Sequence, residues 1–356
     1  MKVCILGNGL TSFTLAKALI NQGIEVDICS NVKLKNYSKF QTLGITKSNI
    51  DFFNKNILNI EKIGWKIHDI EIFSENLLNE KILNFNNRNE HLFSVIRNFD
   101  LYNSLYLNLK KNKLIHFKKD SNYKDLIQKY NLVFNCENKN IISKKFFSKR
   151  IDKKYESYAH VTTILHKKIS ANNTASQIFT KDGPIAFLPI SPSETSIVYS
   201  RKGGKHINFI ELIKKYNSKF KILKINDVFS FELFSSNLRN YHHQNIIAFG
   251  DSLHRLHPLA GQGFNMIVRD IEVVVDLIKF KKEHGLDLDN SICLNFEKKT
   301  RSKNYLFSFG VDAIYEFFNF ESKIKNKSFA KTIKYFGKNK FLNKIFTKFA
   351  DKGIIY

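Results

Sequence analysis

The residues best suited to chemistry lie between Gly250 and Asp270, where glycines, carboxylates and a proline follow an apolar segment. Gly250 and Asp251 end the predicted strand 245–251, and open sheets bind ligands at the carboxyl ends of their strands. There the Asp251 carboxylate can accept hydrogen bonds from sugar-alcohol hydroxyls. Pro258 fixes a turn, and the glycines at 261 and 263 bring bare backbone against a flat ligand just before a helix. The residues predicted to contact this ligand are Gly250, Asp251, Pro258, Gly261, Gln262, Gly263, Phe264 and Asn265.

A second glycine-rich turn lies at the start of the sequence. Gly7, Gly9 and Ser12 follow a GxGxxG pattern with serine in the third place, between an apolar strand and a helix. In that setting the backbone N–H groups of the turn can bind a pyrophosphate at the helix N-terminus, so we expect dinucleotide binding by Gly7, Gly9, Leu10, Thr11 and Ser12. An acidic residue that binds a ribose hydroxyl is expected about 20 positions further on. Ser30 stands at that place, and its hydroxyl can still form a weaker hydrogen bond.

Other kinds of catalytic site find little support. The sequence has no GxSxG elbow, HExxH motif or Walker loop, and its four cysteines are scattered without a CxxC pair. His254 and His257 have a spacing that could place two imidazoles on one helical face. Pro258 disfavours helix at His257, however, and no third ligand is nearby. We therefore expect no metal, and for the two histidines a place behind the bound ligand, in the turn, or at the surface.

Several elements must position these residues. The strand before Gly7, the helix after it and a strand at 24–30 form a β-α-β unit, which is typical of parallel sheets. Another buried strand is predicted at 131–136, and a long helix from Gly263 towards Lys281. We also expect helices near 47–60, 99–112 and 207–219, and strands near 66–74, 80–86 and 226–234. Alternating residues separated by DGP and SPSE turns indicate an antiparallel sheet over 158–200.

The pattern GD(x)xHxxHPxxGQGxNxxxxD in residues 250–270 resembles the second FAD-binding motif of the class A flavoprotein monooxygenases, which share the para-hydroxybenzoate hydroxylase fold. The segments SYAHVTTILHKK, FTKDGPIAFLPIS and SIVYS are most similar to the ubiquinone-biosynthesis hydroxylases. The resemblance implies that the Gly7 turn contacts the FAD diphosphate and Asp251 the ribityl chain. It implies that Pro258 and Gly261 flank the isoalloxazine ring, with no catalytic side chain because the flavin carries the chemistry.

The same resemblance implies an α/β fold in which two domains interleave. A Rossmann-like FAD-binding domain with a parallel sheet takes residues 1–65, 90–157 and 240–320. A smaller substrate domain with an antiparallel sheet takes residues 66–89 and 158–239. Basic C-terminal helices take residues 321–356.

The sequence departs from the family's pattern on the adenosine side. Gln41 stands where the family has an arginine, and Asn98, with Arg97 beside it, stands at a second arginine place, where we expect Asn98 to contact FAD. The family's DG pair appears as Glu137 and Asn138. These changes weaken the adenosine half of the site and put direct reduction by NAD(P)H in doubt.

The implied activity is FAD- and O2-dependent hydroxylation of a lipid-soluble polyprenyl-phenol or quinone precursor in ubiquinone biosynthesis, through a flavin C4a-hydroperoxide. Two alternatives stay open. One is a related FAD hydroxylase or reductase with another substrate. The other is a catalytically silent scaffold subunit of a membrane-associated biosynthetic complex.

Composition bears on partners more than on chemistry. The chain has 356 residues, 43% of them hydrophobic, and a net charge of +25, which favours polyanionic partners. Part of this basicity reflects a bias towards Lys, Asn, Ile and Phe. No uninterrupted apolar run of about 18 residues is present, and the first residues do not resemble a signal peptide. We expect a cytoplasmic protein.

The last residues are strongly basic. Ten lysines and one acid lie between Lys323 and Lys352, and Phe and Ile recur there at helical spacing. Two basic amphipathic helices of this kind suit an anionic membrane surface, which predicts peripheral contact with the inner face of the membrane. The alternative is a helical pair packed on the body with a solvated lysine face. Nucleic acid is not expected, because the aromatic residues lie on the apolar stripe.

Overall fold

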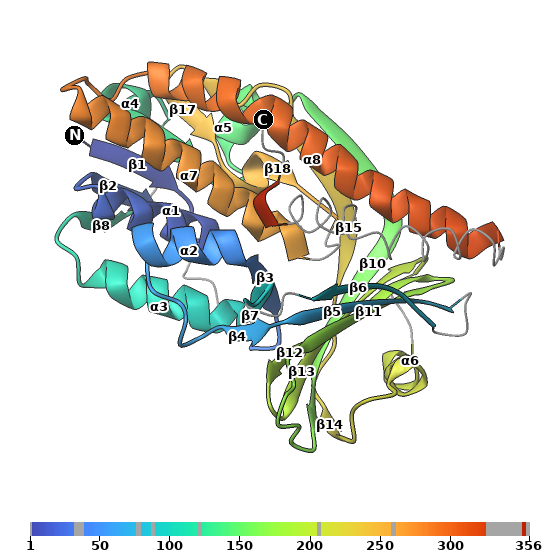
Figure 1. Cartoon of the computed structure of the whole chain (residues 1–356). Helices are drawn as coiled ribbons and strands as arrows, with labels where there is room; N and C mark the ends of the chain where they lie inside the picture. The colour runs from blue at the N-terminus through green and yellow to red at the C-terminus, as the bar shows by residue number, and fades with distance from the viewer. Residues whose placement is uncertain are drawn as a thin grey trace.

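The computed structural model describes residues 2–31, 39–75, 80–86, 90–119, 123–204, 208–257, 261–324 and 351–353. Within these ranges the strands form three sheets (Figure 1). The predicted α/β fold, with a parallel sheet, antiparallel sheets and C-terminal helices, is confirmed. The predicted basic helices at 321–356 lie almost entirely outside the described residues.

The first sheet carries the β-α-β unit. Its order is β16-β17-β9-β1-β2-β8, and every pair is parallel except β16 with β17. The strands are β1 (Lys2–Leu6), β2 (Glu25–Cys29), β8 (Ile115–Lys118), β9 (Leu132–Asn135), β16 (His242–His243) and β17 (Ile246–Ala248). β1, β9 and β17 are almost wholly apolar because helices cover both faces. Their carboxyl ends lie at one edge, which brings the Gly7 turn and Gly250 together.

Helices pack on this sheet through the largest hydrophobic core. They are α1 (Leu10–Asn21), α2 (Lys47–Asn56), α3 (Asn98–Lys110), α4 (Tyr123–Lys129), α5 (Ile141–Phe146) and α7 (Gln262–Glu283). α7 packs against α1, and the long α8 (Ser291–Ile324) runs beside α7 and reaches over the antiparallel sheet (Figure 1). The sequence pattern predicted α7 closely, but we did not predict α8.

The second sheet is antiparallel except for one parallel pair, β11 with β5. Its order is β18-β15-β10-β13-β12-β11-β5-β6, with β14 beside β10. The strands are β5 (Asp69–Ser74), β6 (Glu80–Asn86), β10 (Arg150–His166), β11 (Thr174–Thr180), β12 (Gly183–Ser191), β13 (Glu194–Lys202), β14 (Ile222–Ile225), β15 (Phe229–Leu238) and β18 (His254–Arg255). α6 (Phe209–Tyr216) packs on it. β10 runs through position 157, where we placed a domain boundary, and the division into domains remains a prediction.

A small third sheet, β3-β7-β4, lies between the two larger ones and was not predicted. It consists of β3 (Thr42–Thr46), β4 (Trp65–Ile67) and β7 (Phe93–Arg97). The single strand expected at 66–74 is in fact two. The chain leaves β4 at His68, whose N–H donates to the carbonyl of Asn173, and then enters β5 of the second sheet.

Candidate cofactor site

The first glycine turn leads directly into the N-terminus of α1. Gly7 has a φ of +108°, and Gly9 is the N-cap of α1 without any side-chain cap. Gly9 itself offers no side chain to cap the first N–H groups of α1, and a glycine at this position allows the close approach of an anionic ligand. Ser12 is buried in the third place of the motif, as its small size allows.

The two glycine motifs meet although 239 residues separate them. Gly250 begins a short 3-10 turn, Gly250–Ser252, with a φ of +64°. A Cβ at this position would lie 2.5 Å from Cγ2 of Thr11. Only glycine fits this approach, and it fixes the Gly250 turn against the start of α1.

Asp251 follows directly in that turn, and its side chain is exposed. None of the hydrogen bonds or ion pairs found in the described parts of the chain uses its carboxylate. A carboxylate held at the carboxyl edge of a parallel sheet, and not engaged by the protein, is able to accept hydrogen bonds from a hydroxyl-rich ligand.

Contacts with β3 and hydrogen bonds of Asn265 hold the glycine loop before α7 in place. Gly261 is the N-cap of α7 with a φ of +64°, and a Cβ there would lie 3.4 Å from the backbone nitrogen of Gly44 in β3. The Asn265 side chain accepts hydrogen bonds from the backbone N–H of Thr46 and from Asn49, both at 2.9 Å, and donates to the carbonyl of Gly44. Its amide is thus engaged within the protein. Both polar atoms of the Asn265 side chain therefore hold the loop in place, and its contact with the cofactor stays a prediction.

Open space lies beside Gly263 of the same loop. A Cβ added at Gly263 would meet no atom within 4 Å, and Oε1 of Gln262 is buried without a hydrogen-bond partner. Phe264 packs partly buried against the main core. Open space beside a glycine and an unused buried acceptor are what a hydrogen-bonding flat ligand requires. Pro258 lies outside the described residues, so the predicted flat cavity beside 258–263 stays untested.

The residues predicted near the adenosine half of FAD differ in how far the protein itself already engages them. Ser30 donates its backbone N–H to the carbonyl of Lys118 at the end of β2. Asn98 starts α3, and its Oδ1 is buried with no hydrogen-bond partner, which leaves it able to bind a donor. Arg97 is engaged in an ion pair with Glu194 in β13. A Cβ at Gly7 would lie 2.9 Å from Cγ of Glu137, so this acidic side chain lies against the predicted pyrophosphate turn.

The two histidines of the second motif are buried, so the surface interpretation of them was wrong. Nε2 of His254 lies 2.5 Å from Oδ2 of Asp270, whose other oxygen accepts from Asn304 of α8. His257 lies between the rings of Tyr155 and Tyr315, with centroids 4.7 and 4.2 Å away. Desolvation lowers the pKa of His257 to about 3, so it is neutral. Both histidines serve the packing around the loop.

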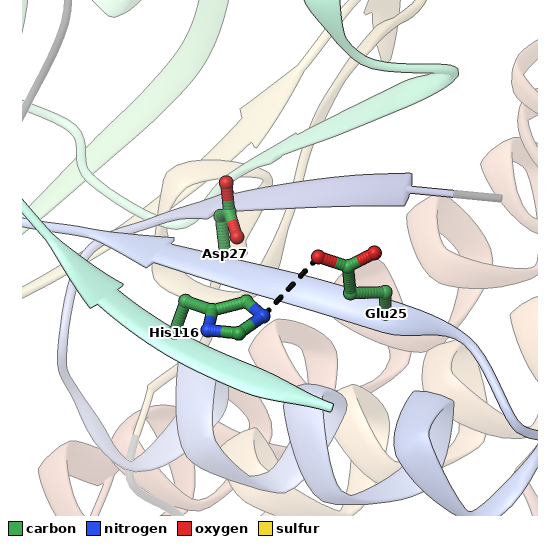
Figure 2. Close-up of side chains that lie close together, drawn as sticks. All are labelled: Glu25, Asp27 and His116. Atoms are coloured by element: carbon green, nitrogen blue, oxygen red, sulfur yellow. Dashed lines mark ion pairs between the residues drawn. The ribbon is translucent and has the colours of Figure 1, made fainter. Parts of the chain in front are cut away.

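A third histidine belongs to an acidic cluster away from these loops. Glu25, Asp27 and His116 have ligand atoms within 4.8 Å of one another (Figure 2). Lys2 lies 2.7 Å from Glu25, and Lys118 lies 2.5 Å from Asp27. Desolvation opposes ionisation of Asp27, but hydrogen bonds from Lys118 and Tyr130 outweigh it and lower its pKa. The lysine ammonium groups already balance these carboxylates, so the cluster is an ion-pair network.

Aromatic residues of the second sheet reach the same region. Phe179 of β11 packs with Leu256, which precedes the glycine loop, and with Met266 of α7. Phe187 of β12 instead packs in a separate core with Phe220. Phe179 is therefore the better candidate for a wall of a substrate site.

Comparison with known proteins supports the resemblance. The chain is 26% identical over 153 residues to the 3-demethoxyubiquinol 3-hydroxylase of Escherichia coli, a match covering 40% of the chain and 39% of that protein. It is 26% identical over 177 residues to a ubiquinone hydroxylase of Rhodospirillum rubrum, covering 46% of the chain and 41% of that protein. The matches thus span less than half the length of these relatives. No protein-family model matches the chain.

Solved structures confirm the fold over nearly the whole chain. The p-nitrophenol 4-monooxygenase of Pseudomonas putida superposes with a TM-score of 0.79 at 10% identity, covering 97% of this chain and 96% of that one. Klebsiella pneumoniae HpxO, solved with FAD and uric acid, gives a TM-score of 0.75 at 10% identity, covering 99% and 97%. The chain therefore has the fold of FAD-dependent aromatic monooxygenases, and its sequence relatives are ubiquinone hydroxylases.

Proposed function

We propose that this chain is an FAD-dependent monooxygenase that hydroxylates the aromatic ring of a polyprenyl-phenol or quinone precursor in ubiquinone biosynthesis. The observation that carries the proposal is the meeting of the two glycine motifs, where Gly250 contacts Thr11 at the carboxyl edge of the parallel sheet. The relatives named as ubiquinone hydroxylases support the substrate class.

Each part of the site then has a role. The N-terminus of α1 binds the FAD diphosphate, and Asp251 accepts hydrogen bonds from the ribityl hydroxyls. The loop from Gly261 to Gly263 lies against the isoalloxazine ring, with Gln262 as a further acceptor. Bound FAD, once reduced, supplies the activation of O2. The protein holds the ring, excludes water and positions the lipid-soluble substrate.

The choice of electron donor depends on the residue that replaces the family's aspartate. Glu137 replaces the aspartate of the family's DG pair, and its side chain lies against the Gly7 turn. The family's aspartate carries the same charge, but the longer Glu137 side chain places its carboxylate against the turn, where it repels both a diphosphate and an incoming anionic nicotinamide cofactor. We therefore favour weakened FAD binding and a donor other than NAD(P)H.

The same observation supports the alternative of a catalytically silent scaffold subunit, since Glu137 at the turn and Arg97 paired with Glu194 both remove support for the adenosine half. A related FAD hydroxylase or reductase with another substrate is the second alternative. No described helix is long and apolar enough to cross a bilayer. Cytoplasmic location with peripheral contact to an anionic membrane, within a biosynthetic complex, completes the proposal.

Two measurements test it. Purified protein incubated with FAD should show flavin absorbance at about one FAD per chain. Lipids extracted after deletion of the gene should contain an unhydroxylated quinone precursor, which restoration of the intact gene removes. Failure to bind FAD in excess favours the scaffold. FAD binding without accumulation of the precursor favours a different substrate.

A further inference from the structure

The outer face of α8 carries a row of apolar side chains exposed to solvent. Leu306 is 42% exposed and Phe309 is 65% exposed, and Tyr305, Phe317 and Phe320 are exposed as well. At 3.6 residues per turn these positions fall within an arc of about 120°. We refer to these five residues as the α8 outer stripe.

The opposite face of α8 is already packed over the candidate site. Phe307 and Val311 lie in one core with Phe179 and Met266. Tyr315, one turn on, packs with Tyr155 in another core. α8 thus has an inner face that covers the region beside the glycine loop and a separate outer apolar face. Large exposed apolar surfaces of this kind are rare on monomeric proteins and usually mark a binding surface.

The charges around the stripe indicate which kind of partner it binds, an anionic lipid surface or a second copy of the chain. Lys298 and Lys299 are exposed on the same side of α8, one to two turns before Tyr305. Glu316, an acid within the arc, is paired with Lys153 at 3.1 Å. Nine further lysines follow α8 in the sequence, from Lys325 to Lys352. A second copy of a chain with net charge +25 would be repelled, whereas an anionic lipid surface would be attracted.

We propose that the α8 outer stripe is a membrane-docking surface that inserts its apolar side chains among anionic lipids. In this arrangement the inner face of the same helix stays over the site. A polyprenylated substrate could then pass from the bilayer to the site without crossing water. This link to the substrate rests on the proposed function, and the α8 outer stripe specifies the surface that makes the membrane contact proposed there.

Binding to lipid vesicles tests the docking surface. The double variant Leu306→Ser with Phe309→Ser removes two apolar side chains from the first turns of the stripe. Its matched control is Leu107→Ser with Phe280→Ser, which changes the same residue types at 56% and 54% exposure on α3 and α7. Full-length proteins are compared by flotation with vesicles of phosphatidylcholine alone or mixed with phosphatidylglycerol.

The wild type should bind the mixed vesicles far better than phosphatidylcholine alone, and added salt should weaken this binding. The stripe variant should bind the mixed vesicles roughly tenfold less tightly, because it loses two of the five inserted apolar side chains, and the control should bind like the wild type. Equal binding by the stripe variant and the wild type overturns the proposal, as does an equal loss in the control.

Sedimentation equilibrium without lipid tests whether the stripe instead binds a second copy of the chain. If the wild type self-associates and the stripe variant does not, the face joins copies of the chain and the proposal is wrong. FAD binding of each variant is measured separately. A chain that binds vesicles but no FAD retains the docking surface and loses the proposed function, and these two failures are therefore distinguishable.

Discussion

Gly250 lies so close to Thr11 that a Cβ at position 250 would come within 2.5 Å of the Thr11 side chain. This contact joins the two glycine motifs into one site. It depends on a positive φ and on the absence of a side chain, two properties that only glycine combines.

Replacement of Gly250 with Ala should lower the free energy of unfolding by about 2–4 kcal/mol, from backbone strain and steric overlap together. Gly285→Ala is the matched control, since Gly285 has a φ of +65° but open space around it. It should cost only about 1 kcal/mol. Denaturant unfolding of both variants measures the difference, and equal losses would mean that the contact with Thr11 contributes nothing.

Replacement of Glu137 with Gln should strengthen FAD binding by roughly three- to tenfold, because it removes a negative charge beside the predicted diphosphate. The gain should shrink at high salt. Fluorescence titration with FAD measures it, and Glu283→Gln at the far end of α7 is the control. Unchanged or weaker binding by the Glu137 variant contradicts the placement of the diphosphate at the Gly7 turn.

His257 should make stability depend on pH. Burial lowers its folded-state pKa from 6.5 to about 3, so below pH 6.5 the unfolded chain takes up a proton that the folded chain does not. Stability is therefore lost as pH falls from 6.5 towards 3, by up to about 1.4 kcal/mol per pH unit. His257→Phe keeps an aromatic ring between Tyr155 and Tyr315 and should reduce this loss.

The measurement is the unfolding free energy at pH 7 and pH 5 for the wild type, His257→Phe and the exposed control His284→Phe. The His257 variant should lose about 2 kcal/mol less than the wild type over this interval. The control should behave like the wild type. An identical pH dependence in all three proteins would show that His257 is protonated in the folded chain.

The lysines near the end of the sequence should add to membrane binding. Changing Lys338, Lys340, Lys344 and Lys348 to Gln should weaken binding to anionic vesicles by roughly tenfold or more, at about 1 kcal/mol per lysine near the surface. The control changes Lys110, Lys111, Lys113 and Lys129 and so removes the same charge elsewhere. If both sets reduce binding equally, only the net charge matters and this segment has no specific role.

Sequence patterns predicted the parts of this molecule that depend on local rules. The β-α-β unit, the antiparallel strands over 158–200 and α7 follow from the spacing of apolar residues, and the positive φ values at Gly7 and Gly250 follow from glycine in tight turns. These elements place the two glycine motifs at the carboxyl edge of the parallel sheet.

The rest depends on contacts between distant residues. Asn265 matches a cofactor motif, yet its amide binds Thr46 and Gly44, more than 200 positions away. The small sheet containing β3 has no strong alternation of its own, because its strands are short and packed between two larger sheets. The burial of His254 and His257 likewise depends on Asp270, Tyr155 and Tyr315, which local periodicity does not specify.

In the proposed function, Asp251 and the two glycine turns hold FAD. The most direct test of this role is the dissociation constant of FAD for the wild type, for Asp251→Ala and for the control Asp276→Ala on α7. We expect FAD binding by the wild type and the control, and a loss of roughly tenfold to a hundredfold for the Asp251 variant, because charge-assisted hydrogen bonds are removed. Unchanged affinity of the Asp251 variant, or no binding by the wild type in excess FAD, would contradict this role.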